Sequence, residues 1–259
     1  MKVTGGTPGT GEFREYRFGV GHRGGKPLFT LRFTDYPGKY LISPGTPDEE
    51  KLQRALIRAD VVLLAIDVPA LVEQRGRYHD LVNQPLTVTA EVKRMLDEDT
   101  SRLVILAPLK CERYVDTAAG AQRVADRISE EYAPLLNYIG AGAVRSRVGC
   151  VLTPVQTIGS VVFSEVEEKT PGQPVFHFRS RRVGAVYGPV DTDQPLRYAL
   201  RFIVNKYRTS QRGQLRTIWQ QVMGTDAALV AAMDEFSAGQ PTGQGFMVLQ
   251  DHPFLQPGR

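Results

Sequence analysis

The chain has 259 residues, of which 42% are hydrophobic and 23% are charged, and its formal net charge is +4. These values are typical of one sizeable globular domain, or of one domain with an appendage. They argue against a membrane-spanning helix, because the longest apolar run, residues 61–66, is only as long as a strand. The mild charge is spread along the chain, which argues against nucleic acid as a partner.

The cysteines and the N-terminal residues indicate the cellular compartment of the protein. Cys111 and Cys150 are too few for a disulfide framework, and no Cys/His spacing resembles a metal site. The first residues lack the apolar core of a signal peptide. A cytoplasmic location is therefore expected.

The first ordered element predicted is an antiparallel hairpin. Residues 1–12 are rich in Gly and Thr and predict a mobile arm. Alternating apolar residues at 13–20 and 27–33 predict two strands, and the second strand ends at Asp35. An Asp at a strand tip followed by a close Gly, here Gly38, is how nucleoside triphosphatases place a carboxylate near Mg²⁺ and an N–H near a terminal phosphate. The alternative is a plain Asp-Pro-Gly turn.

Three later apolar runs predict buried parallel strands, at 60–67, 102–107 and 147–152. Helical patterns lie before, between and after them, at about 48–59, 86–98, 118–132 and 194–207. This alternation predicts an α/β fold with a doubly wound, mostly parallel sheet and one antiparallel hairpin strand. Ligands of such sheets bind at the carboxyl ends of the strands.

Two regions lie outside this alternation. Residues 160–190 predict an insertion with a hairpin, and the basic cluster Arg179, Arg181 and Arg182 is either a solvated strand face or a contact for phosphate or an acidic partner. Residues 208–259 predict a helical appendage, with helices at about 214–223 and 227–236, and a tail.

The strand ends, taken in order, resemble the motif series of the translation-factor-like (TRAFAC) branch of P-loop GTPases. Asp35-Tyr-Pro-Gly38 resembles the Asp-x-x-Gly motif, and Leu109-Lys110-Cys111-Glu112 resembles Asn/Thr-Lys-x-Asp with Leu109 in place of Asn/Thr. Thr153-Pro154 lies where the family has a short turn under the base. The resemblance covers residues 13–207, and its second motif is most similar to bacterial double-GTPases, which are associated with conflict or signalling loci.

The resemblance implies a role for each matching residue, with GTP and Mg²⁺ as cofactors. Asp35 would hold Mg²⁺ through water, Thr10 would be the Mg²⁺-sensing Thr, and the Gly38 amide would contact the terminal phosphate.

The base would lie at the later motifs. Glu112 would accept hydrogen bonds from guanine, and the Lys110 stem would lie along the base, above the Thr153-Pro154 turn. The alternative for Lys110 and Glu112 is a surface ion pair after a buried strand.

The sequence contains no Gly-x-x-x-x-Gly-Lys-Ser/Thr segment, the phosphate cradle of these proteins, and Gly-Gly-Lys at 24–26 is a poor substitute. The resemblance implies that the cradle and its strand would precede residue 1, with that strand between the Asp35 strand and the Val61 strand. Three arrangements could deal with the gap that this strand would leave. Another strand fills it, for which residues 246–249 are a better candidate than residues 1–3. Alternatively, the two flanking strands pair directly, or the chain is a fragment.

Three functional hypotheses follow. The leading one is a GTPase-like domain that is catalytically weak or inert and binds another protein, such as a companion GTPase. The second is an active GTPase whose phosphate cradle lies in an upstream segment. The third is an α/β binding module that uses no nucleotide.

Overall fold

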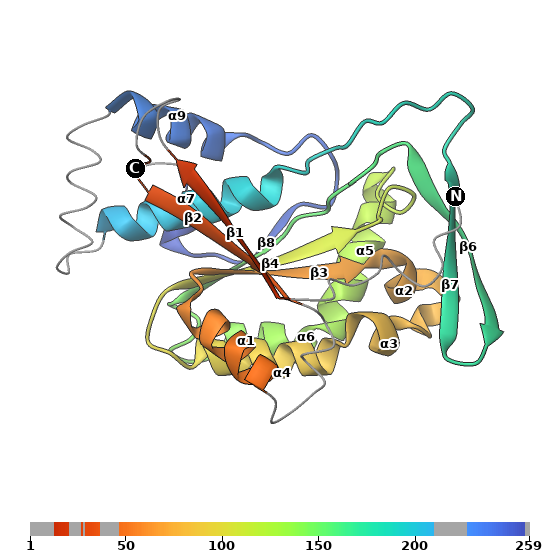
Figure 1. Cartoon of the computed structure of the whole chain (residues 1–259), viewed down its shortest axis with the longest axis horizontal. Coiled ribbons are helices and arrows are strands. Elements are labelled where there is room, and N and C mark those ends of the chain that lie inside the picture. The colour runs from red at the N-terminus through yellow and green to blue at the C-terminus, as the bar shows by residue number, and fades with distance from the viewer. Residues whose placement is uncertain (1–12, 21–26, 28, 37–46, 210–226, 257–259) are drawn as a thin grey trace.

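A four-stranded sheet, with helices on both faces, forms the centre of the computed structural model, which describes residues 13–20, 27, 29–36, 47–209 and 227–256 (Figure 1). Its strands, in spatial order, are β3 (Val61–Asp67), β4 (Arg102–Leu109), β5 (Val148–Leu152) and β8 (Met247–Gln250). The first three are parallel, and β8 is antiparallel to β5. The α/β class and the mostly parallel sheet are thus confirmed.

The predicted helices are present, close to their expected bounds: α1 (Pro47–Arg58), α4 (Pro85–Leu96), α5 (Ala118–Glu131), α7 (Gln194–Thr209) and α9 (Ala227–Ala238). Each of the shorter helices was missed: α2 (Val68–Val72), η2 (Glu73–Gly76), α3 (His79–Asn83), α6 (Ala133–Ile139) and η3 (Pro253–Leu255). None of the described helices is both long enough and apolar enough to cross a bilayer. The helix expected at 214–223 lies outside the described residues.

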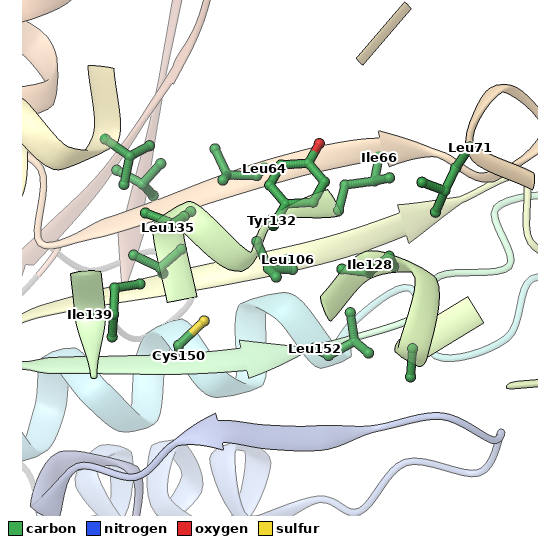
Figure 2. Packing of buried hydrophobic residues seen from close by; sticks show 14 of the residues in the cluster. Leu64, Ile66, Leu71, Leu106, Ile128, Tyr132, Leu135, Ile139, Cys150 and Leu152 are labelled. Atoms are coloured by element: carbon green, nitrogen blue, oxygen red, sulfur yellow. The ribbon is translucent and has the colours of Figure 1, made fainter. Parts of the chain in front are cut away.

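The larger core lies on the sheet face covered by α1, α4, α5 and α6 (Figure 2). Leu64 and Ile66 of β3, Leu106 of β4 and Leu152 of β5 point toward the aromatic ring of Tyr132 and the aliphatic residues around it. All of these side chains are almost fully buried. Burial of this kind stabilises the fold by about 25 cal/mol per Å² of apolar surface.

The opposite face is covered only in part. Phe202 of α7 and Leu255 of η3 pack against β4 and β5 residues of that face. Every residue of β4 from Arg102 to Pro108 is buried, as predicted for a strand covered on both sides. On β3, however, Leu64 is 5% exposed while Leu63 is 47% exposed. The prediction that β3 is buried on both faces is therefore wrong: on the α7 side Val61 packs against the smaller core, whereas Leu63 and Ala65 are exposed.

The N-terminal hairpin is separate from the main sheet. β1 (Arg14–Val20) and β2 (Phe29–Asp35) pair antiparallel with each other in a two-stranded sheet. Phe29 and Leu31 pack against α7 and α9, and Tyr36, just after β2, packs against the main core. The hairpin is confirmed, but the expectation that its strand belongs to the parallel sheet is wrong. Among the described residues, no strand pairs with the outer edge of β3.

The strand expected near residues 246–249 forms, but at a different place. The sequence favours this strand as the one that fills a gap beside β3, whereas the structure pairs it with β5, at the opposite edge, as β8. Val151 faces Val248 in this register, and Leu249 packs against the main core. Three elements of the range predicted as appendage and tail thus contact the rest of the chain, since α9 packs against α7 and η3 packs against β4 and β5.

A second hairpin, β6 (Val161–Thr170) and β7 (Gln173–Ser180), is the predicted feature of the 160–190 region. Phe163 and Phe176 pack with Ala70 of α2 and with Tyr78. The Tyr78 hydroxyl donates a hydrogen bond to Glu168 at 2.9 Å. These contacts hold the hairpin beside the segment that follows β3 (Figure 1).

Candidate functional site

The carboxyl ends of β3 and β4 carry an ion pair. The Lys110 ammonium lies 2.6 Å from Asp67 Oδ2, and the two side chains are 24% and 12% exposed. Lys110 adopts a left-handed backbone conformation, with φ at +56°, which residues other than glycine rarely adopt. This turn ends β4 and sends Cys111 into the core, where it is fully buried.

Asp67 is fixed by α2 and α3. As the N-cap of α2, its carboxylate accepts a hydrogen bond from the Ala70 N–H at 3.0 Å. The Asn83 side chain accepts from the Asp67 N–H at 2.8 Å and donates to the Asp67 carbonyl at 3.1 Å. Asn83 also contacts His79 Nδ1 at 2.9 Å, and burial lowers the pKa of His79. Asp67 thereby presents its second oxygen to Lys110 in a fixed orientation.

Glu112 is 3% exposed and holds two loops. Its Oε1 accepts hydrogen bonds from the N–H groups of Ile158 and Gly159, at 3.2 and 3.4 Å. The Arg181 guanidinium donates to the Glu112 carbonyl at 3.2 Å. A Lys110–Glu112 ion pair, the alternative considered from the sequence, is not what forms, because Lys110 pairs with Asp67. Recognition of guanine by Glu112 stays a prediction.

Thr153 and Pro154 are buried beside the end of β4. The Thr153 N–H donates to the Leu106 carbonyl at 2.9 Å, and the Val155 N–H donates to the Pro108 carbonyl at 2.9 Å. The Thr153 hydroxyl is buried and has no hydrogen-bond partner in the described part of the chain. The turn that the resemblance places under a base is thus continuous with β5.

The neighbouring thiols are poor nucleophiles. Burial raises the pKa of Cys111 to about 12, and its Sγ donates to the Val155 carbonyl at 3.5 Å. Burial likewise raises the pKa of Cys150 to about 12. Because the thiolate is the reactive form, both cysteines are in the unreactive thiol form at neutral pH.

The structure gathers some of the predicted site residues and separates others. Lys110, Glu112, Thr153 and Pro154 lie at the ends of β4 and β5. Asp35 ends β2, outside that sheet. Next to Asp35, burial raises the pKa of Tyr36, and the charges of Glu91 and Asp35 act in the same direction. Thr10 and Gly38 lie outside the described residues. Within the described ranges, no three His, Cys, Asp or Glu side chains gather as metal ligands.

Sequence reasoning noted Asp67 as a strand end but missed its partners. Asn83 lies 16 residues further along the chain, in a helix of five residues with no apolar period. No local pattern connects two such positions.

Comparisons with protein-family models, with curated proteins and with solved structures find no match for this chain. The resemblance to GTPases therefore rests on the motif residues alone, and the function is argued from the site.

Proposed function

We propose that the chain is a GTPase-like α/β domain that acts by binding another protein and is itself catalytically weak or inert. Its context would be a bacterial signalling or conflict system, and its partner a companion GTPase. The observation that carries the proposal is β3, which has the sequence of an interior strand but lies at an edge of the described sheet.

An open strand edge presents unpaired backbone N–H and C=O groups, which are a template for another strand. On β3 this edge adjoins an uncovered apolar face with Leu63 and Ala65 exposed. The occupant that fits is an extended segment of the partner, hydrogen-bonded along β3, with apolar side chains beside Leu63. The resemblance supports the same place, since it implies a strand between the Asp35 strand and β3.

Two features support weak or absent catalysis. The printed sequence has no phosphate cradle. In addition, the Glu112 side chain, which the resemblance assigns to recognition of guanine, already accepts two backbone hydrogen bonds through one of its oxygens.

A photo-crosslinking amino acid placed at position 63 tests the partner. In cells of the source organism, we expect one adduct of defined mass, whose crosslinked peptide is an extended apolar segment. The same amino acid at Leu86, which is 71% exposed on α4, is the matched control. No adduct at position 63, or identical adducts at both positions, would contradict the proposal.

The second candidate function is guanine nucleotide binding, with Mg²⁺ at Asp35. It is favoured by one observation, the gathering of Lys110, Glu112 and Thr153 at adjacent strand ends. Thermal unfolding with millimolar Mg²⁺–GTP or Mg²⁺–ATP separates the two hypotheses, because a ligand of the folded state raises the melting temperature. If GTP but not ATP raised the melting temperature, and Glu112→Gln abolished this rise, the hypothesis of a catalytically inert domain would be overturned.

A further inference from the structure

A cavity with a basic lining opens beside the loops that Glu112 holds. It has a volume of about 320 Å³ and is lined by Gly159, Ser160, Arg181, Arg182, Ala185 and Val186. None of these six residues is acidic. Its size is at the lower end of the range for small-molecule sites, which is about 300–1,000 Å³.

The cavity walls are two loops that are tied together. The Arg181 N–H donates to the Ser160 carbonyl at 2.9 Å, and the Gly188 N–H donates to the Ile158 carbonyl at 3.1 Å. Gly159 has φ at +71°, and a Cβ there would collide with the Gly188 carbonyl oxygen. Only glycine therefore allows this close approach of the two loops. Glu112 anchors the Gly159 side through its carboxylate.

The two guanidinium groups differ in what they contact. Arg181 bonds to the Asp116 carboxylate and to the Glu112 carbonyl, which fixes its position and leaves further N–H donors. Arg182 is exposed, and no residue in the described part of the chain forms an ion pair or side-chain hydrogen bond with it. The cavity lining therefore contains two guanidinium groups, of which Arg181 is paired with Asp116 and Arg182 has no acidic partner in the described part of the chain.

We propose that this cavity binds a phosphate group. Arginine guanidinium groups recognise phosphate and carboxylate through paired hydrogen bonds. Phosphate is favoured over carboxylate because its oxygens can accept from both arginines and from the Ser160 hydroxyl together, whereas a carboxylate has only two oxygens. The glycine at 159 lets the loop that carries Ser160 lie against the Gly188 backbone, and this contact forms one wall of the cavity.

The site is independent of the protein partner proposed for β3. It involves no β3 residue and does not require base recognition by Glu112. Its phosphate has two conceivable sources, a free phosphate compound or the phosphate chain of a nucleotide, and the test distinguishes them.

Calorimetric titration of the full chain with inorganic phosphate, pyrophosphate, GTP and ATP is the test. We expect saturable pyrophosphate binding that weakens with added salt. Arg182→Gln should weaken it at least about tenfold, because a charge-assisted hydrogen bond is lost. Arg179→Gln is the matched control, since Arg179 is exposed on β7 and does not line the cavity.

Each outcome decides the proposal. Binding of pyrophosphate alone that depends on Arg182 supports a free phosphate ligand. Equal binding of GTP and ATP that depends on Arg182 supports the phosphate chain of a nucleotide as the ligand. No saturable binding of any of the four ligands, or equal losses in Arg182→Gln and Arg179→Gln, overturns the proposal.

Discussion

At the scale of single residues, Arg102 shows how one buried charge joins two elements. It begins β4 and is 3% exposed. Its guanidinium donates to the carbonyls of Leu56, Ile57 and Ala59 at the end of α1, at 3.3 Å for Leu56 and 2.7 Å for Ile57. The Leu56 carbonyl also accepts a hydrogen bond from the Ala59 N–H, and a cation at this helix end satisfies the remaining acceptors and complements the helix dipole. Burial lowers the pKa of Arg102.

Arg102→Met should therefore destabilise the fold by about 3 kcal/mol, because buried carbonyls lose a charged donor. Arg102→Lys should recover part of the loss, since one ammonium cannot reach three carbonyls in the same geometry. Urea denaturation measures both. Arg58→Met, at an exposed position of α1, should stay within about 0.5 kcal/mol of the parent. Equal effects of Arg102→Met and Arg58→Met would contradict this role.

At the scale of elements, β3 has two unlike faces. Val62, Leu64 and Ile66 contact the main core, whereas Leu63 and Ala65 face away from it. The alternation follows from the period of two in a strand. The sequence of the strand is apolar on both faces, so the difference in burial comes from what packs on each side.

Alanine substitutions of two adjacent leucines would measure the difference in burial between the two faces of β3. Leu64→Ala should cost about 3 kcal/mol of unfolding free energy, because it leaves a cavity in the core. Leu63→Ala should cost less than about 1 kcal/mol in the purified chain, because half of its surface is already exposed. If denaturation gave similar losses for both variants, the outer face of β3 would be covered in solution, and the partner surface proposed for it would be wrong.

At the scale of the whole molecule, buried histidines connect stability to pH. His79 is 2% exposed and His252 is 4% exposed, and burial lowers the pKa of both below the ordinary 6.5. The charges of Glu131 and Asp80 oppose the shift at His79, and Arg127 reinforces it. His79 Nε2 has no hydrogen-bond partner in the described part of the chain.

The sign of the pH dependence follows from proton binding. Below pH 6.5 the unfolded chain binds protons that the folded histidines do not, so stability should fall as the pH falls through that value. Above it, the contribution of both histidines is fully present. Urea denaturation between about pH 7.5 and pH 5.5 should show this fall, and His79→Gln should flatten it. An unchanged slope in His79→Gln would contradict the assignment.

The long elements of the fold were accessible from the sequence. Each strand of the parallel sheet is an apolar run bounded by polar residues, and α1, α4, α5 and α7 show apolar stripes over three or more turns. The short helices α2 and α3 were not, because five residues are too few to show a period. Asp67 and Glu112 were visible as acids near strand ends, but their hydrogen-bond partners were not.

The sequence by itself determined the element types, the parallel sheet and the order in which polar residues reach its carboxyl edge, since these follow from local periodicity and from the alternation of strands and helices. Only the tertiary structure decided that the hairpin pairs with itself, that β8 joins β5, and that β3 is left at an edge. Strand pairing uses the backbone N–H and C=O groups that nearly all residues carry, so the apolar pattern of one strand does not identify which other strand it pairs with. The same holds for the arginine-lined cavity, which exists because two distant loops meet at Gly159.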